Sequence, residues 1–303
     1  MVLKLKKHFT KYGALWIMLL IPVAVLILFK YIPMYGVQIA FRNYRITRSM
    51  EDSPWVGLKY FTKFFEYYDF WPIMRNTLVV NLYSLLTFPI PLILAVMLTH
   101  LPYNRMKKLV QNVTYLPHFI STVVLCSMII QFSNARTGLF NSVGAVFGLP
   151  PTNLMAHKEY YYSIFVWSDV WRNMGYNSIV YIAALAGVSP DLHEAAIVDG
   201  ASIMKRIWHI DIPSILPTFC ILLIMRCGQL LNIGYEKVLL LQNSLNTSVS
   251  EVISTYVYNI SLNASSPQFS YATAIGLFSS VINLIILVSV NQLVKKIDGT
   301  TLM

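Results

Sequence analysis

Six long apolar stretches constrain this chain more than any other feature. They cover roughly residues 14–33, 76–99, 109–132, 161–187, 213–235 and 270–294. A helix of about 20 mostly apolar residues crosses the hydrocarbon core of a bilayer, and it pairs its own backbone groups where lipid offers no partner. The stretches lack the alternation of polar and apolar residues that marks a β-barrel strand. We therefore expect an all-α integral membrane protein with six transmembrane helices.

The amino-acid composition supports this class. Only 12% of the 303 residues are charged and 56% are hydrophobic, whereas soluble domains carry about a quarter charged residues. These values exclude a soluble enzyme and a disordered chain. In a membrane protein the net charge of +10 indicates helix orientation, so we expect no nucleic-acid partner. The three cysteines lie in apolar runs and are expected to be small buried side chains: Cys126, Cys220 and Cys227.

Lysine and arginine placement predicts the orientation of the helices, because cytoplasmic loops are enriched in both. The first stretch follows four lysines (Lys4, Lys6, Lys7 and Lys11) and lacks a cleavage site, so we interpret it as a retained signal-anchor helix. Six spans then place both termini in the cytoplasm, and Lys237 falls in a short outer loop. The basic outer loop at 34–75 disagrees with the rule, which is weak for long extracellular segments. We expect a single domain over residues 1–303 and a multi-pass location in the cell membrane.

The long outer loop contains an aromatic segment at 59–71. Phe61, Phe64, Phe65 and Tyr68 recur at helical spacing and form one apolar face. Such a face is typical of a helix lying in the membrane interface. The alternative is a surface that receives an external partner.

Sequence signatures of catalysis are absent from the chain. It has no Gly-x-x-x-x-Gly-Lys-Ser/Thr phosphate loop, no His-Glu-x-x-His and no Gly-x-Ser-x-Gly. Its six histidines are scattered without metal-ligand spacing. We therefore expect no catalytic residue and no metal site, and transport is the leading hypothesis.

The connection between the fourth and fifth stretches, residues 189–212, has a helical pattern. Ser189 is suited to cap a helix, Pro190 fits its first position, and Gly200 supplies a break or a positive φ. A second amphipathic piece follows, with Ile203, Ile207 and Ile210 at helical spacing. A helix–glycine–helix of this kind suits insertion into a partner's groove. The alternative is an amphipathic connection lying on the membrane.

This connection resembles the EAA loop of membrane subunits of binding-protein-dependent ABC importers. The resemblance rests on Glu194-Ala-Ala-Ile-Val-Asp-Gly-Ala201 followed by Ile210-Asp-Ile-Pro213. Further strings are similar to the maltose-type carbohydrate permeases, in the branch that imports polysaccharide-derived oligosaccharides: Asn76-Thr77, Tyr115-Leu-Pro-His-Phe-Ile-Ser121, Tyr181-Ile-Ala-Ala-Leu-Ala-Gly187 and Ala274-Ile-Gly-Leu-Phe278. The chain departs from the branch at His193, where tyrosine is common.

The resemblance implies the type I ABC importer permease fold and a set of partners. These are a second homologous permease, two ABC ATPase subunits, an extracellular solute-binding protein, and an oligosaccharide substrate, all at the lipid membrane. ATP and Mg would be bound by the partner ATPase, so this chain would be a transport subunit without a cofactor. The implied ATPase-coupling residues are Glu194, Ala195, Ala196, Asp199, Gly200 and Ala201.

Polar side chains inside the fourth and fifth stretches mark a candidate substrate pathway, because charges within a span usually face protein or water. Asp169, Arg172, Asn173 and Tyr176 share one helical face. The candidate pathway residues are Trp171, Arg172, Asn173, Tyr176, Arg226, Gln229 and Asn232. The structural alternative is that Asp169 and Arg172 neutralise each other and that the other polar residues join helices.

Three other functions stay open on the sequence. The chain is also compatible with a permease for another small solute, with a stand-alone secondary transporter or channel, and with an integral membrane enzyme. The second lacks an evident inverted repeat or midplane acidic cluster, and the third lacks a catalytic constellation.

Overall fold

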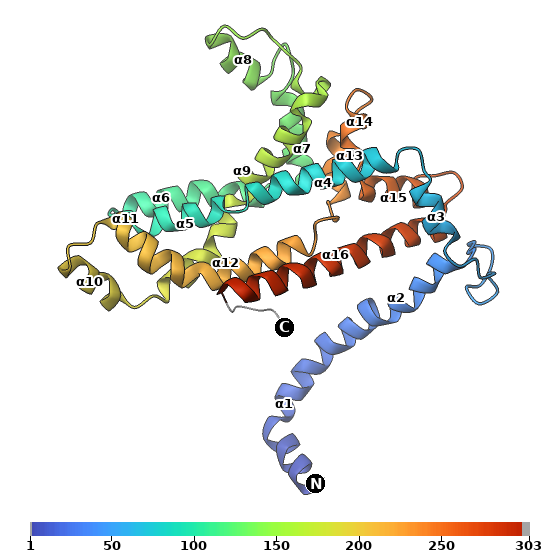
Figure 1. Ribbon diagram of the computed structural model, residues 1–303, viewed down its shortest axis with the longest axis horizontal. Coiled ribbons are helices and arrows are strands. Elements are labelled where there is room, and N and C mark those ends of the chain that lie inside the picture. Colours follow the sequence, from blue (N-terminus) through green and yellow to red (C-terminus); the bar gives the residue numbers. More distant parts are fainter. Residues whose placement is uncertain (1, 299–303) are drawn as a thin grey trace. The chain divides into compact units, whose positions relative to one another are not determined.

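The computed structural model describes residues 2–298, with the side chains of residues 12–296, and this range is almost entirely helical (Figure 1). Within it, extended backbone pairs only in an isolated antiparallel bridge between Arg42 and Trp55. The lysines that precede the first apolar stretch lie outside the described side chains. The chain divides into two compact units, one of residues up to 66 with 260–278, the other of residues 67–259 with those from 279 onward.

The first unit contains a long apolar helical run. Residues 12–41 form one run that is long and apolar enough to cross a membrane, so the predicted span 14–33 lies inside a longer helix. The run turns π-helical just before Pro33, whose ring cannot donate a backbone hydrogen bond. The helical elements that begin and end in this unit are α1 (Val2–Leu26), η1 (Ile27–Tyr31), α2 (Ile32–Met34), η2 (Tyr35–Phe41) and α3 (Lys59–Phe65).

The aromatic segment packs within the first unit. Its helix, α3, ends at Phe65, so the predicted helix over 59–71 is too long and Tyr68 lies beyond its end. Phe64 is buried against Phe278, with ring centroids 5.7 Å apart. Phe61 lies 5.5 Å from the ring of Phe41. Part of the predicted apolar face is therefore covered by the chain itself.

The second unit holds most of the helices. They are α4 (Phe70–Leu86), α5 (Ile90–Thr99), α6 (Asn104–Tyr115), η3 (Leu116–Phe119), α7 (Thr122–Phe132), α8 (Leu139–Val146), η4 (Leu154–Ala156), α9 (Lys158–Ala186), α10 (Pro190–Val198), α11 (Ile203–Arg206), η5 (Ile207–Asp211), α12 (Ile212–Cys227), α13 (Tyr235–Leu241) and α14 (Thr247–Ser250). Helices α15 (Ile253–Ser261) and α16 (Phe269–Asp298) belong to both units.

Four helical segments of the described chain are long and apolar enough to cross a membrane: 12–41, 70–99, 203–227 and 269–296. A fifth results if residues 104–119 and 122–132, which are bent by 100°, form one span. Helix α9 is 29 residues long but does not qualify, because polar side chains interrupt it. The predicted count of six spans is therefore not confirmed, and the cytoplasmic location of both termini stays a prediction.

The predicted third span, 109–132, is broken by a bend of 100° between two helical segments. Its two halves meet at Ile120 and Ser121, which both have extended backbone. Ser121 then caps α7, accepting a hydrogen bond from the backbone N–H of Val124 at 3.3 Å. A serine N-cap inside an apolar run therefore restarts the helix in a new direction.

The predicted fifth span, 213–235, is displaced toward the N-terminus. One continuous helical segment runs from Ile203 to Cys227, so the amphipathic piece after Gly200 is the beginning of this helix. The segment absorbs Pro213 through the π-helical turn η5, in which the N–H of Ile212 donates to the carbonyl of Ile207. It ends before Gly228, and α13 begins only at Tyr235.

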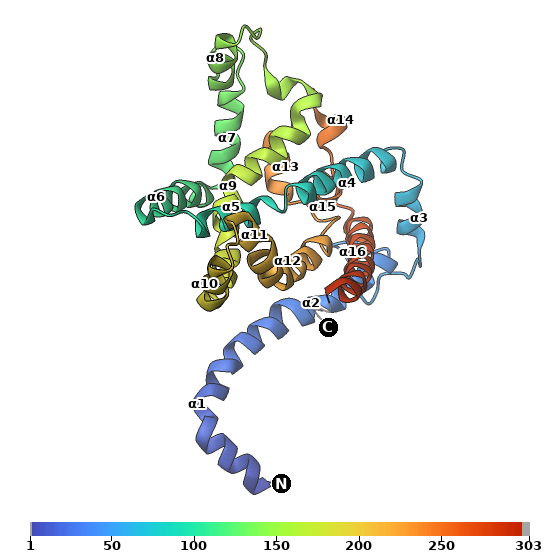
Figure 2. The same ribbon diagram turned by 60° about the vertical axis from the view of Figure 1, so that its left-hand side comes forward.

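Helix α9 lies at the centre of the second unit, next to α5 and α6 (Figure 2). Gly175 permits the contact with α6, because a Cβ there would overlap the carbonyl oxygen of Thr114. Small residues allow this close approach of helices in a membrane, where packing replaces the hydrophobic driving force. An apolar cluster joins α5, α9 and α12: Ala95, Val96, Tyr181, Leu185 and Ile215.

Asn76 and Thr77 lie inside α4 rather than at its beginning, because the helix starts at Phe70. The amide of Asn76 donates to the carbonyls of Ser248 and Glu251 at 3.1 and 3.0 Å. The hydroxyl of Thr77 accepts from the N–H of Ile253 at 3.1 Å. The pair therefore fixes the chain after α14 to α4.

Candidate functional site

The candidate coupling segment is a capped helix followed by a sharp glycine turn. Ser189 accepts a hydrogen bond from the N–H of Asp191 at 3.3 Å and Pro190 is the first helical residue, as the sequence predicts. Gly200 has φ +74°, which confirms the predicted positive φ. The N–H of Ala201 donates to the carbonyl of Ala196 at 2.8 Å, closing a Schellman motif. The turn is therefore a defined structure and not a loose loop.

Helix α10 lies beyond α11 at the edge of the second unit (Figure 1). None of its residues is buried, and Val198 is 87% exposed. The structure brings the six candidate coupling residues together on α10 and its glycine turn. Four of them are exposed and two, Ala196 and Ala201, are partly buried. An exposed helix with apolar side chains, on a stiff elbow, has the form of a docking element.

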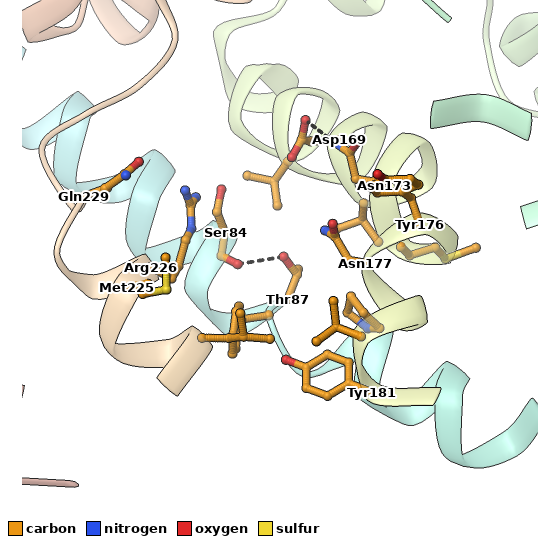
Figure 3. A pocket seen from close by; sticks show the side chains of 17 residues that line it. Ser84, Thr87, Asp169, Asn173, Tyr176, Asn177, Tyr181, Met225, Arg226 and Gln229 are labelled. Atoms are coloured by element: carbon orange, nitrogen blue, oxygen red, sulfur yellow. Dashed lines mark hydrogen bonds between the residues drawn. The ribbon is translucent and has the colours of Figure 1, made fainter. Parts of the chain in front are cut away.

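A cavity of about 400 Å³ opens between α4, α9 and α12 (Figure 3). Asn173, Tyr176 and Asn177 of α9 line one side, and Arg226 of α12 lies across from them. The remaining polar lining comprises Ser84, Thr87, Asp169, Tyr181 and Gln229. Polar and aromatic side chains that converge on one space are typical of a small-molecule site.

The cavity lies where two membrane helices are interrupted. Residues 87–89 form a turn between α4 and α5, and Thr87 donates its hydroxyl proton to the carbonyl of Ser84 at 2.9 Å. Helix α12 ends at Cys227, just before Gln229. Interrupted helices free backbone groups that must find partners or water, which explains why this region is polar.

A second cavity of about 230 Å³ shares Ser84, Asp169 and Arg226 with the first. It is also lined by Asn81, Thr122, Arg172, Asn232, Glu236 and Lys237. The two cavities therefore form one polar region with shared walls. Three basic side chains and two acidic ones line the second cavity: Arg172, Arg226, Lys237, Asp169 and Glu236.

The ion pair of Asp169 is with Lys237, at 3.8 Å, and among the described residues no such pair joins Asp169 to Arg172. The alternative in which Asp169 and Arg172 neutralise each other is therefore wrong. Arg172 instead donates to the hydroxyl of Thr122 at 3.0 Å, and its Nε is buried without a hydrogen-bond partner in the described part of the chain. Lys237 is a buried residue of α13, only 8% exposed, and not part of an exposed loop, while its side of the membrane stays a prediction.

The sequence matches the family model described as "Binding-protein-dependent transport system inner membrane component" over residues 72–299. This match covers most of the chain. The chain belongs to this family. It is accordingly a multi-pass membrane permease, and the predicted resemblance to this family is confirmed.

Two relatives and a solved structure are similar over nearly the whole permease. It is 38% identical to the polygalacturonan/rhamnogalacturonan transport system permease protein YteP of Bacillus subtilis, over 93% of this chain and 88% of that one. It is also 38% identical to the protein LplB of the same organism, over 93% and 89%. A bacterial ABC transporter involved in the import of the acidic polysaccharide alginate has a chain that is 34% identical, with a TM-score of 0.87, over 97% and 99%.

Six of the seven predicted pathway residues line the two polar cavities of this permease: Arg172, Asn173, Tyr176, Arg226, Gln229 and Asn232. Trp171 does not. It lies two residues from Asp169 and two from Asn173, which places it about 200° round the helix from both. It lines a separate apolar cavity of about 600 Å³ beside α7 and α8.

Sequence reasoning missed several residues of the polar region. Ser84 and Thr87 line it because the helix is interrupted at Thr87-Phe-Pro-Ile-Pro91, and the two prolines were the available signal. Asn177 lies one turn after Asn173 and extends the polar face of α9. His118 stacks on Tyr176, with centroids 3.8 Å apart, and its Nδ1 lies 2.9 Å from Oδ1 of Asn173. That contact was invisible in the sequence because η3 and α9 are far apart in the chain.

Proposed function

We propose that this chain is a permease subunit of an ABC importer that moves oligosaccharides released from polysaccharides into the cell. The observation that carries the proposal is the pairing of a polar cavity between membrane helices with an exposed, glycine-hinged helix on the same unit. The relatives named above, one for polygalacturonan or rhamnogalacturonan and one for alginate, support the substrate class.

In this proposal the energy comes from other subunits. A second homologous permease completes the pathway, and two ATPase subunits bind ATP and Mg. One of them receives α10 at Glu194, Ala195, Ala196, Asp199, Gly200 and Ala201. An extracellular binding protein delivers the sugar; a related transporter has been crystallised with an alginate pentasaccharide-bound periplasmic protein. This permease itself would then carry out no catalysis. ATP binding would drive transport only if α10 is held differently in two states of the permease.

The charge of the polar region favours acidic oligosaccharides. Asp169 is already paired with Lys237, which leaves Arg172 and Arg226 facing the cavities against the exposed Glu236. Arg226 has a long contact of 3.5 Å to Asn81 and Arg172 binds a neutral hydroxyl. Guanidinium groups bind carboxylates with short, charge-assisted hydrogen bonds. Sugar-acid carboxylates would therefore find two cationic partners here.

Uptake by the reconstituted assembly tests this function. The permease, purified with the subunits that accompany it, is placed in liposomes with its binding protein and with or without internal ATP. We expect ATP-dependent uptake of short oligogalacturonides and much weaker uptake of neutral oligosaccharides of equal length. Uptake that needs no ATP would favour a stand-alone secondary transporter, and transport of an unrelated solute alone would contradict the substrate class.

A further inference from the structure

A buried aspartate lies at the root of the coupling segment. Asp211 is the last residue of the π-helical turn η5 and is only 1% exposed. A carboxylate out of water is costly unless it is paired and hydrogen-bonded. π-helical turns inside longer helices are rare and occur often at functional sites. Asp211 therefore needs polar partners. Because it lies between α11 and α12, any side chain that binds it is attached to the helical segment that follows the candidate coupling turn.

Two histidines, one in α10 and one directly after α5, supply these partners. Nε2 of His100 lies 2.6 Å from one carboxylate oxygen of Asp211, and Nε2 of His193 lies 3.4 Å from the other. In the described part of the chain these two histidine side chains are the ones that lie within 4 Å of the Asp211 carboxylate through a ring nitrogen. The two rings are close to each other, with centroids 6.1 Å apart. One carboxylate thus joins three elements that lie far apart in the sequence.

The Asp211 cluster joins α10 to η5 and to the end of α5, which are the elements through which a movement of α10 can be transmitted to the cavity. His193 belongs to α10, immediately before Glu194, and His100 directly follows the last residue of α5. Helix α5 continues toward the polar cavity, where Pro91 forms part of the lining. It also packs on α9 and α12 through Ala95, Val96, Tyr181 and Ile215. The Asp211 cluster therefore lies between the proposed docking helix and a wall of the cavity.

Helix α10 has few other attachments to the bundle. It has no buried residue, and at both ends it continues into partly or fully exposed backbone at Val188 and Gly200. Its orientation therefore depends strongly on the polar contact between His193 and Asp211. The contact with Asp211 gives a structural reason for histidine at position 193, where the related permeases commonly have tyrosine.

We infer that Asp211 is a positioning residue that holds α10 to α5 through His193 and His100, so that movement of the docking helix reaches the cavity wall. The inference rests on the proposed function for the direction of that movement. The tether itself is a property of this chain alone. Each part can therefore be tested separately.

The variants His193→Leu and His193→Gln separate the polar contact with Asp211 from side-chain bulk. Leucine leaves Asp211 with one partner, whereas the glutamine amide keeps a donor for it. We expect backbone amides of residues 190–199 to exchange with deuterium at least about tenfold faster in His193→Leu, and near the wild-type rate in His193→Gln. His209→Leu is the matched control, because His209 is exposed and its ring contacts the carbonyl of Lys205.

The same variants are then assayed in the reconstituted transporter. We expect His193→Leu to lower the number of sugars transported per ATP at least about fivefold, with His193→Gln restoring most of it. Unchanged amide exchange in His193→Leu would overturn the tether. Faster exchange with an unchanged ratio of sugar to ATP would overturn its role in coupling. If the wild-type assembly neither hydrolyses ATP nor transports, the proposed function fails, while amide exchange still decides the tether.

Discussion

At the scale of single residues, the polar region carries more cationic side chains than anionic ones. Lys237 neutralises Asp169, and it also donates to the carbonyl of Phe165 at 2.7 Å. Arg172 and Arg226 contact only neutral side chains in the described hydrogen bonds. An ionised group in a membrane span is costly and is usually functional. The two arginines are thus the residues whose replacement is most informative.

Arg226→Gln removes one of these charges while keeping a polar side chain of similar reach. We expect uptake of acidic oligosaccharides to fall about tenfold or more, because a charge-assisted hydrogen bond contributes about 1.5–3 kcal/mol. Assembly with the other subunits should be unchanged, as judged by size-exclusion chromatography. Arg136→Gln, in an exposed loop, is the control and should transport normally. Loss of assembly in Arg226→Gln would show that the arginine is structural.

Gly200 is a residue for which backbone conformation decides the outcome. No atom lies within 4 Å of a Cβ built there, so a substitution is strained only through its φ of +74°. A β-branched side chain in this region costs about 1–3 kcal/mol, and asparagine tolerates it far better. We expect Gly200→Val to lose most ATP-driven uptake and Gly200→Asn to retain most of it, with membrane insertion equal in both. Equal transport by the two variants would contradict a role for the turn geometry.

Glu251 gives a pH dependence of stability. Burial, and then repulsion from Asp69, raise the pKa of its carboxyl above the ordinary 4.5. Ionisation therefore costs more in the folded than in the unfolded protein. The protonated Glu251 carboxyl contributes fully to the free energy of unfolding below about pH 4.5, and this contribution is lost as pH rises through the folded-state pKa. We expect Glu251→Gln to raise the melting temperature more at about pH 7 than at about pH 4.5, relative to wild type.

The control for this pH effect is Glu159→Gln, which alters an exposed glutamate at the start of α9. Its melting temperature should follow the wild type at both pH values. A stabilisation by Glu251→Gln that is the same at both pH values would mean that ionisation of Glu251 is not its cause.

At the scale of helices, apolar length predicted where membrane segments lie but not where they break. The run 109–132 is apolar throughout, yet Ser121 caps a new helix within it. The run 213–235 gives no sign in its composition that the helix ends before Gly228. At Gly228 the chain packs so closely on α16 that a Cβ would overlap Leu287. Both outcomes depend on contacts between distant segments, and composition averaged along one segment carries no information about them.

The part of the candidate site that lies on one face of a single helix could be predicted from helical periodicity. The spacing of Arg172, Asn173 and Tyr176 on α9 predicted one polar face, and the structure places that face in the cavities. Trp171 was included as an aromatic residue of the same stretch, although it lies on the other side of α9. The Asp211 cluster was not predicted, because it joins residues that are 111 positions apart.

Gly175→Ala tests the packing of α9 on α6. The new methyl group would overlap the backbone of Thr114, so the helices must separate. Overpacking of this kind costs about 1–3 kcal/mol, and we expect a clearly lower melting temperature in detergent. Gly276→Ala, in α16, is the matched control because its Cβ would meet no atom within 4 Å. An unchanged melting temperature for Gly175→Ala would contradict the tight crossing.

At the scale of the whole molecule, the proposed docking helix and the polar cavity belong to one unit and are joined by α5, α9 and α12. Helix α9 alone spans about 40 Å, since each of its 29 residues adds about 1.5 Å. Helix α8 precedes its N-terminal end and α10 follows its C-terminal end. A partner that binds α10 is therefore separated from one that binds near α8 by about the length of α9.

The central claim is that α10 contacts an ATP-hydrolysing partner. Photo-crosslinking in the intact assembly tests it most directly. A photoreactive amino acid is placed at Val198, which is 87% exposed on α10, or at Val146, which is 82% exposed on α8. We expect crosslinks from position 198 to an ATPase subunit, identified by mass spectrometry, and none from position 146. Absence of an ATPase crosslink from position 198, in an assembly that still transports sugar, would contradict the account.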